Sequence, residues 1–183
     1  MYNIQVQNIV ASSRIGVEFD LDKIQAEFSN TDYNPTQFPG LVYRLKEPKT
    51  SVLIFRSGKI VSTGARTLED VDKCVQNVVS DLKSKGFKVY DKPKVDVQNI
   101  VSSADYGCEV NLNSTAVTLG LEKVEYEPEQ FPGLVYRISD PKVVILLFGS
   151  GKIVITGAKV LPDVEIAAKK LADELKSMGL MFN

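Results

Sequence analysis

Short segments of the chain alternate between hydrophobic and polar residues, which is the period of a β-strand. Residues 4–10 follow this pattern. Three β-branched runs come later, and turn residues separate them, which predicts a meander of hairpins. These runs cover residues 42–45, 52–55 and 60–63. Neighbouring residues in the runs are apolar on both faces of the predicted sheet, a pattern that normally means that both faces are covered.

Other segments carry apolar residues at helical spacing. Residues 21–28 predict a short helix. Thr67 is the predicted N-cap of a longer helix that Gly86 ends, and Pro162 and Gly179 mark the two ends of a second long helix. Apolar stripes define the predicted buried faces of these long helices: Leu68, Val71, Cys74, Val75, Val78, Val79 and Leu82 in the first, and Leu161, Val164, Ala168, Leu171, Leu175 and Met178 in the second.

The chain contains a tandem sequence repeat. The segments QNIV, FPGLVYR and SGKIVxTGA of the first half all return, in the same order, in the second half. We predict repeats over residues 1–90 and 91–183, packed about a pseudo-twofold axis. Their helices can cover only one face of a joint sheet, so an apolar face remains open. Homodimerisation or a small-molecule cavity would explain that face, and so would a large apolar binding surface.

Composition narrows the function. The 183 residues are 44% hydrophobic and 25% charged, which is typical of a globular protein and excludes a disordered chain. Histidine is absent and the two cysteines lie in unlike contexts, which argues against a zinc finger, a disulfide scaffold and histidine-based catalysis. We therefore expect no enzyme activity, no cofactor and no metal. The apolar runs are too short for a bilayer and no signal-like segment begins the chain, so we expect an intracellular protein without a membrane partner.

The net charge of −1 hides a sorted distribution. Basic residues dominate two stretches, at 41–66 and 137–159, whereas residues 101–136 are acidic. The nearly neutral total therefore hides possible binding sites in these stretches.

The repeated segments closely resemble the TATA-box-binding protein family, general transcription factors that recognise promoter DNA. The resemblance covers nearly the entire chain, and the acidic balance is closer to archaeal members. It implies an α+β fold: a saddle-shaped, pseudo-twofold tandem repeat whose ten-stranded antiparallel sheet has helices on its convex face and DNA on the other. It further implies an initiation factor that binds and bends A·T-rich TATA-type promoter DNA through the minor groove.

The resemblance also implies partners and residue roles. The partners are double-stranded promoter DNA, transcription factor B and, indirectly, RNA polymerase, in the cytoplasm of an archaeal cell and associated with its nucleoid. The implied intercalating residues are Phe38, Phe55, Phe131 and Phe148. The implied base contacts are Asn8, Asn99, Thr63, Thr156, Val10, Val61, Val101, Val154, Leu53 and Leu146. The implied phosphate contacts are Arg44, Ser57, Lys59, Arg66, Arg137, Ser150, Lys152 and Lys159. The loop implied to dock transcription factor B holds Glu127, Glu129 and Gln130.

Each role has a structural alternative. A phenylalanine can pack in a core, an asparagine can be satisfied within a sheet, and a lysine can blunt a strand edge. Arg56 receives no role, because the second repeat has Gly149 in its place. Two other classes of function stay open: an enzyme domain with this fold, whose catalytic residues the chain lacks, and a non-DNA-binding structural or small-ligand-binding protein that uses the open sheet face, including a homodimer of the free protein.

Overall fold

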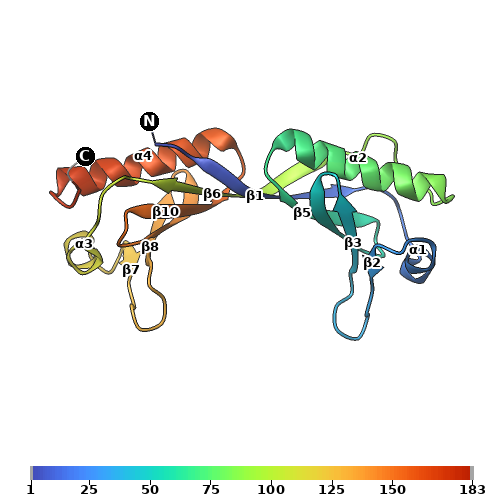
Figure 1. Cartoon of the computed structure of the whole chain (residues 1–183), viewed down its shortest axis with the longest axis horizontal. Helices are drawn as coiled ribbons and strands as arrows, with labels where there is room; N and C mark the ends of the chain where they lie inside the picture. The colour runs from blue at the N-terminus through green and yellow to red at the C-terminus, as the bar shows by residue number, and fades with distance from the viewer. Residues whose placement is uncertain (1, 182–183) are drawn as a thin grey trace. The chain divides into compact units, whose positions relative to one another are not determined.

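The computed structural model describes residues 2–181, and the outermost residues of the predicted repeats, 1, 182 and 183, lie outside this range. The first half of the chain forms five strands and two helices (Figure 1). In order they are β1 (Gln5–Arg14), α1 (Leu21–Glu27), β2 (Thr31–Asp32), β3 (Leu41–Lys46), β4 (Lys49–Ile54), β5 (Lys59–Ala65) and α2 (Leu68–Ser84). The predicted short helix, hairpin meander and long helix are therefore confirmed.

The second half repeats this order of elements. They are β6 (Val95–Asp105), α3 (Leu112–Leu119), β7 (Val124–Glu125), β8 (Leu134–Ser139), β9 (Lys142–Leu147), β10 (Lys152–Ala158) and α4 (Leu161–Ser177). The strand order is β2-β3-β4-β5-β1-β6-β10-β9-β8-β7. The pairs β5–β1, β3–β4 and β4–β5 are antiparallel, and so are their counterparts in the second half.

Two compact units divide the chain differently from the repeats predicted at 1–90 and 91–183. One unit comprises residues 8–98, and the other joins residues 1–7 to residues 99–183. Each unit contains a piece of β1 and a piece of β6. Within one, Gln98 Nε2 donates to Ser12 Oγ at 2.8 Å, and within the other, Gln7 Nε2 donates to Ser103 Oγ at 2.8 Å. We call them the first unit (8–98) and the second unit (1–7 and 99–183).

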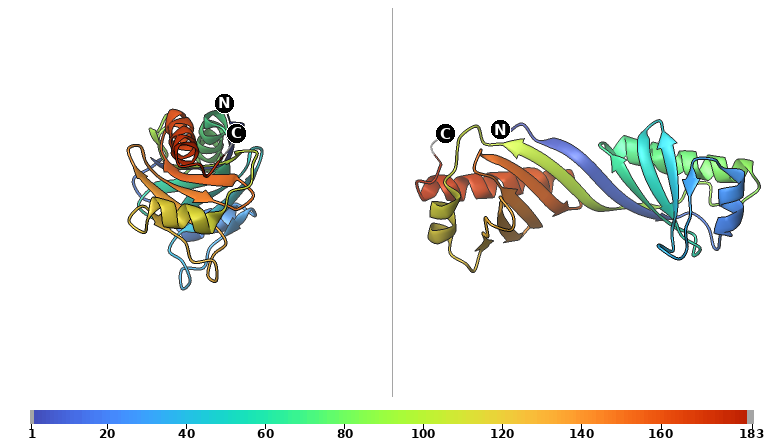
Figure 2. Two further views of the ribbon diagram at one scale, coloured as in Figure 1. Left: turned by 90° about the vertical axis from the view of Figure 1, so that its left-hand side faces the viewer. Right: turned by 60° about the horizontal axis from the view of Figure 1, so that its bottom comes forward.

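The long helix of each unit covers one face of its strands, as Figure 2 shows for α2 and α4. Along β4, Val52 and Ile54 are fully buried, whereas the intervening Leu53 is half-buried. The same alternation runs along β9, where Val143, Ile145 and Leu147 are buried. Since successive side chains of a strand point to opposite faces, each unit has one face under its helix and one apolar face without a helix.

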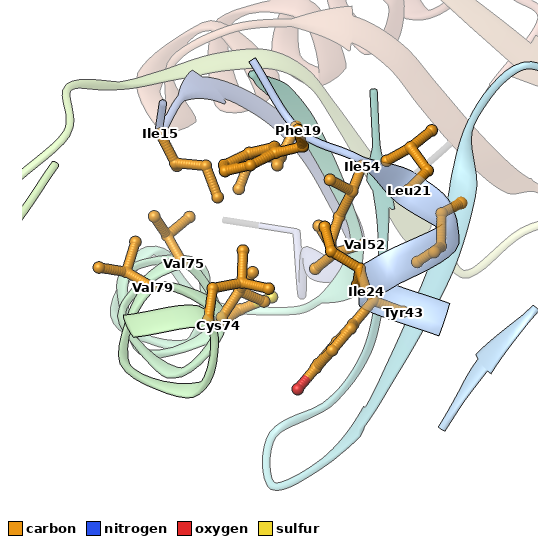
Figure 3. Packing of buried hydrophobic residues seen from close by; sticks show 14 residues of the cluster. Ile15, Phe19, Leu21, Ile24, Tyr43, Val52, Ile54, Cys74, Val75 and Val79 are labelled. Atoms are coloured by element: carbon orange, nitrogen blue, oxygen red, sulfur yellow. The ribbon is translucent and has the colours of Figure 1, made fainter. Parts of the chain in front are cut away.

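The core of the first unit lies between α2 and the covered face of the sheet (Figure 3). Cys74 of α2 lies toward Val52, whereas Val75 and Val79 of the same helix lie toward Ile15, and the short α1 closes the side of this cluster. Burial raises the pKa of the Cys74 thiol, which keeps it neutral and chemically quiet. This core fixes the position of the strands that carry the open face.

Helix ends follow the predicted signals, with one correction. The Thr67 side chain accepts a hydrogen bond from the Asp70 N–H at 3.0 Å, as predicted, and Gly86 and Gly179 have positive φ values of 84° and 69°. The predicted apolar stripes are too long. Leu68, Leu161 and Met178 are exposed, because they lie in the first turn or just past the last turn of their helices.

A half-buried carboxylate of α4 forms hydrogen bonds with residues of the sheet side of the second unit. Glu174 accepts hydrogen bonds from the Tyr136 hydroxyl and from Lys123 Nζ. Burial alone would raise the pKa of Glu174, but these two donors outweigh it and lower the pKa below the ordinary carboxyl value. The charged form is therefore favoured in the folded state.

We expect Glu174→Gln to lower the stability of the chain at about pH 7 and to flatten its acid dependence. A carboxylate with a depressed pKa contributes stability above its unfolded pKa, about 4.3, and loses it as the pH falls through the folded value. Denaturant unfolding at neutral and acidic pH measures this difference. Glu165→Gln, at an exposed site on the same helix, is the control; equal acid profiles for both variants would contradict the assignment.

Candidate nucleic-acid interface

The open face of each unit has an apolar floor. In the first unit, Leu53 pairs with Val61 across β4 and β5, and Val10 of β1 lies on the same half-buried face. In the second unit, Leu146 pairs with Val154, and Val101 completes the floor. The structure thus brings together, within each unit, the three floor residues predicted for it.

Asn8 is held by a network next to a β-bulge. The register of β1 against β5 shifts between Ile9 and Ala11, and Gly64 adopts a φ of 102° opposite this shift. The N–H of Gly64 donates to Asn8 Oδ1 at 2.7 Å, and Asn8 Nδ2 donates to Thr63 Oγ1 at 3.0 Å. The anchored oxygen fixes which end of the amide carries the hydrogens, so the orientation of Asn8 follows from the backbone.

Asn99 repeats this arrangement in the second unit. Gly157, with a φ of 103°, donates its N–H to Asn99 Oδ1 at 2.6 Å, and Asn99 Nδ2 donates to Thr156 Oγ1 at 3.0 Å. An amide nitrogen carries two hydrogens, and only one is used here. Each unit therefore offers a spare amide N–H on its open face, beside a threonine hydroxyl that donates only a long 3.4 Å hydrogen bond to the oxygen of the same asparagine.

Each open face carries a phenylalanine pair, with one ring from the loop that follows β2 or β7 and one from the hairpin that follows β4 or β9. Phe38 and Phe55 meet edge to face, with ring centroids 6.0 Å apart and an interplanar angle of 68°. Phe131 and Phe148 form the same pair at 5.9 Å and 68°. Phe38 and Phe131 are 43% and 40% exposed, which is unusual for rings that could have joined the core. Core packing therefore does not explain these two rings.

Sequence reasoning missed the role of the glycine that follows each Phe-Pro. A Cβ atom on Gly40 would lie 2.8 Å from Phe38 Cε1 and 3.0 Å from Phe55 Cε1. On Gly133 it would lie 2.7 Å from Phe131 Cε1 and 3.0 Å from Phe148 Cε1. Both rings rest on a backbone without a side chain. The signal was present in the repeated Phe-Pro-Gly, but only the structure shows that the glycine accommodates two rings at once.

We expect Gly133→Ala to displace the Phe131–Phe148 pair while leaving the fold stable. A ring forced about 30° from its rotamer costs about 0.5–1.5 kcal/mol, and these rings lie at the surface. Gly149→Ala is the matched control, because its nearest atom, Val110 O, would be 3.7 Å from the new Cβ. Thermal unfolding and a crystal structure of each variant test this; unmoved rings in Gly133→Ala would show that the pair does not depend on the glycine.

The predicted phosphate contacts are all exposed. They are Arg44, Ser57, Lys59 and Arg66 in the first unit, and Arg137, Ser150, Lys152 and Lys159 in the second. Arg137 Nη2 lies 3.7 Å from Glu125 Oε1, and among the described residues no other basic member of this set has an ion pair. Ser57 and Ser150 Oγ each accept the N–H of the lysine two residues on, at 3.4 Å. The charged groups remain available to an external anion.

The loop between β7 and β8 presents carboxylates to solvent. Glu127, Glu129 and Gln130 are exposed, and the Glu127 carbonyl accepts the N–H groups of Gln130 and Phe131 at 2.9 and 3.0 Å. Figure 1 shows this loop extending away from the side of its unit that carries α4. In residues 2–181 neither carboxylate has an ion pair, so both are free to meet a basic partner.

Over the same residues, no group of three or more acidic, histidine or cysteine side chains lies close enough to hold a metal ion. None of the described helices is long and apolar enough to cross a membrane. The features that gather on the open faces are donors, apolar side chains, exposed rings and basic edges.

A family model described as transcription factor TFIID, or TATA-binding protein (TBP), matches residues 3–85 and again residues 94–178. The chain belongs to this family. Among archaeal relatives, it is 53% identical to the TATA-box-binding protein of Archaeoglobus fulgidus over 180 residues, which cover 98% of each chain. It is 52% identical to that of Thermoplasma acidophilum over 178 residues, or 97% of each chain.

The structure of Methanococcus jannaschii TBP matches with a TM-score of 0.87 and 48% sequence identity, covering 95% of this chain and 98% of that one. With the strand order, this confirms the predicted α+β fold class of the TATA-binding protein family, and the two matched segments confirm the tandem repeat. The roles of individual residues stay predictions.

Proposed function

We propose that the protein is a transcription initiation factor that binds A·T-rich TATA-type promoter DNA in the minor groove and bends it. The anchored amides of Asn8 and Asn99, each with a spare N–H on an open apolar face, carry this proposal. Family membership supports it, since the relatives are TATA-box-binding proteins.

The minor groove accounts for the chemistry of these donors. A·T pairs present only acceptors there, adenine N3 and thymine O2, whereas guanine adds an amino group. An amide N–H fixed toward the groove donates a hydrogen bond to such an acceptor, and it clashes with the amino group of guanine. The half-buried Val10, Leu53 and Val61 would cover the sugars and base edges without discriminating sequence.

The exposed rings account for the bend. Minor-groove proteins insert apolar side chains between base steps, and the contacts made by the ring offset an unstacking cost of a few kcal/mol per step. Each Phe pair would enter one step, and exposed basic residues beside it would hold the phosphates in register. TATA-box-binding proteins are themselves the standard example of this kink, roughly 80°, so its size is carried over from the family.

Recruitment of transcription factor B, and of RNA polymerase through it, is the finer part of the proposal. The exposed carboxylates of the β7–β8 loop support it, because the corresponding first-unit loop has Asn34 and Thr36 at those positions. An acidic loop in only one unit gives a symmetric DNA-bound protein a distinguishable end.

We expect an A·T-rich duplex to bind and a G·C pair at the centre of the site to weaken binding by about 1–3 kcal/mol per replaced pair. Asn99→Ala should weaken binding to the best site and narrow that difference, because its donor is lost. Gel shifts with A·T-rich and G·C-rich duplexes of equal length measure both effects.

Two variants control for folding and charge. Asn99→Asp keeps an oxygen for the Gly157 N–H while removing the donor hydrogens, so it separates base reading from support of the bulge. Asn113→Asp adds the same negative charge at an exposed site of α3, so it measures the effect of charge alone and should bind nearly as the wild type does. If the wild type binds central A·T and G·C sites equally, the readout by these asparagines is wrong; binding to neither duplex would favour a structural or small-ligand-binding protein.

A further inference from the structure

The two units carry unlike charges at equivalent positions of their open faces. Arg14 is the last residue of β1 and pairs directly with Lys59 of β5. The equivalent last residue of β6 is Asp105, which pairs with Lys152 of β10. Both lysines belong to the predicted phosphate contacts. The basic residue beside Lys59 is therefore replaced by an acidic one beside Lys152.

The Arg14–Lys59 pair is unfavourable in the free protein. Directly opposed residues of an antiparallel pair share a face, and like charges there are destabilising. Both side chains are exposed, neither has an ion pair within the described residues, and the Arg14 Nε–H donates only to the Gly16 carbonyl, at a long 3.4 Å. A phosphate placed between the two cations would remove the repulsion and form charge-assisted hydrogen bonds with both.

Asp105 has the opposite effect in the second unit. Its Oδ1 accepts the Gly107 N–H at 2.8 Å, which holds the carboxylate at this edge. Asp105, Phe148, Ser150 and Lys152 line one open hollow of about 590 Å³ on the open face. A phosphate approaching Lys152 meets the negative charge of Asp105 in the same hollow, so its attraction is weaker than beside Lys59.

Two further differences between the units also leave the first unit with more positive charge. The hairpin after Phe55 carries Arg56, where the hairpin after Phe148 has Gly149. Arg137 of the second unit lies 3.7 Å from Glu125, whereas Arg44, its counterpart, has no ion pair in the described chain. Counted over equivalent positions, the first unit presents more uncompensated positive charge to an anion than the second.

We propose that Arg14 and Arg56 make the first unit the stronger phosphate-binding half, and that Asp105 weakens the second, so that the protein orients itself on DNA before any partner binds. This inference rests on the proposed DNA-binding function. The half of the site with the more accessible or more rigidly spaced phosphates would then receive the first unit.

The salt dependence of DNA affinity tests whether the two units bind phosphates unequally. Each phosphate contact contributes about −0.9 to the slope of log affinity against log salt. Arg14→Ala with Arg56→Ala should make the slope shallower by up to about two units, and Asp105→Asn should raise affinity at low salt. Lys23→Ala with Lys73→Ala removes the same charge from the helices of the first unit and should leave the slope nearly unchanged. Equal slopes for the two double variants would overturn the assignment.

The orientation of the protein on DNA tests the consequence of unequal phosphate binding. The probe is a symmetric A·T-rich duplex whose phosphates are replaced by neutral methylphosphonates in one half, with a donor dye at one end. An acceptor dye is placed on Glu165→Cys, on an exposed site of α4, in a Cys108→Ser background. We expect a several-fold preference for the orientation that puts the first unit on the charged half, and its loss or reversal in Arg14→Asp with Asp105→Arg.

Two outcomes separate this inference from the function on which it rests. The inference about orientation alone is overturned if both orientations are equally populated. It is also overturned if Arg14→Asp with Asp105→Arg leaves the preference unchanged. No complex with any A·T-rich duplex overturns the DNA-binding proposal and this inference with it.

Discussion

Replacing Phe131 and Phe148 together by alanine is expected to remove the DNA kink at one end of the site while the fold persists. The two rings form one edge-to-face pair at 5.9 Å, and Phe131 is 40% exposed, so little core packing is lost. Without them, an unstacked base step has no ring contacts to offset its cost of a few kcal/mol. The remaining bend should come from the Phe38–Phe55 pair alone.

Energy transfer between dyes at the two DNA ends measures the bend, with the family value of roughly 80° as the reference for the wild type. Val117→Ala with Leu121→Ala is the control, since both residues are highly exposed apolar side chains of the same unit, on or just beyond α3. An unchanged end-to-end distance in the phenylalanine variant, at saturating protein, would remove the rings from the account of bending.

Much of the fold could be predicted because the repeat states each pattern twice. The alternation through Val52, Leu53 and Ile54 predicted both faces of β4, and the structure buries one face under α2. The helix stripes predicted too much burial at their ends, as Leu161 and Met178 show. A stripe records which side of a helix is apolar, but burial also requires that the strands beneath extend as far as the helix does.

The details of the candidate site depend on tertiary register, which sequence spacing does not contain. The resemblance implies that Asn8 and Thr63 both contact bases. The hydrogen bond from the Gly64 N–H that orients the Asn8 amide forms only because the register of β1 against β5 shifts at this point. The repeated Phe-Pro-Gly marks Gly133 as a turn residue, but its contact with two rings is visible only in the structure. Likewise, the opposition of Arg14 to Lys59 appears only when the two strands are paired.

The carboxylates of the β7–β8 loop lead to the second large expected effect: Glu127→Arg with Glu129→Arg should abolish the ternary complex with transcription factor B and DNA. The corresponding first-unit loop uses its polar side chains internally, where Asn34 Oδ1 accepts the N–H of Thr36 at 3.2 Å and its hydroxyl at 2.7 Å. Glu127 and Glu129 have no such bonds among the described residues, so their charge faces outward.

Exposed charges at an interface act mainly on encounter and on partner choice, and like-charge contacts there cost several kcal/mol. Reversing both carboxylates would therefore convert attraction for a basic surface into repulsion, which is a larger change than neutralisation. Binary DNA binding should stay nearly intact or become slightly tighter, because the reversal adds positive charge close to the phosphates. Gel shifts with DNA alone, and with DNA plus transcription factor B, separate the two effects.

Glu69→Arg with Asp72→Arg supplies the matched control, since it makes the same change in net charge on the exposed surface of α2. This variant should support the ternary complex at the wild-type concentration of transcription factor B, which would show that position rather than total charge matters. If the loop variant also assembles at that concentration, the partner binds elsewhere on the protein. The acidic loop would then be a solvated segment, and the direction of transcription would have to originate from the uneven phosphate grip of the two units or from the flanking DNA.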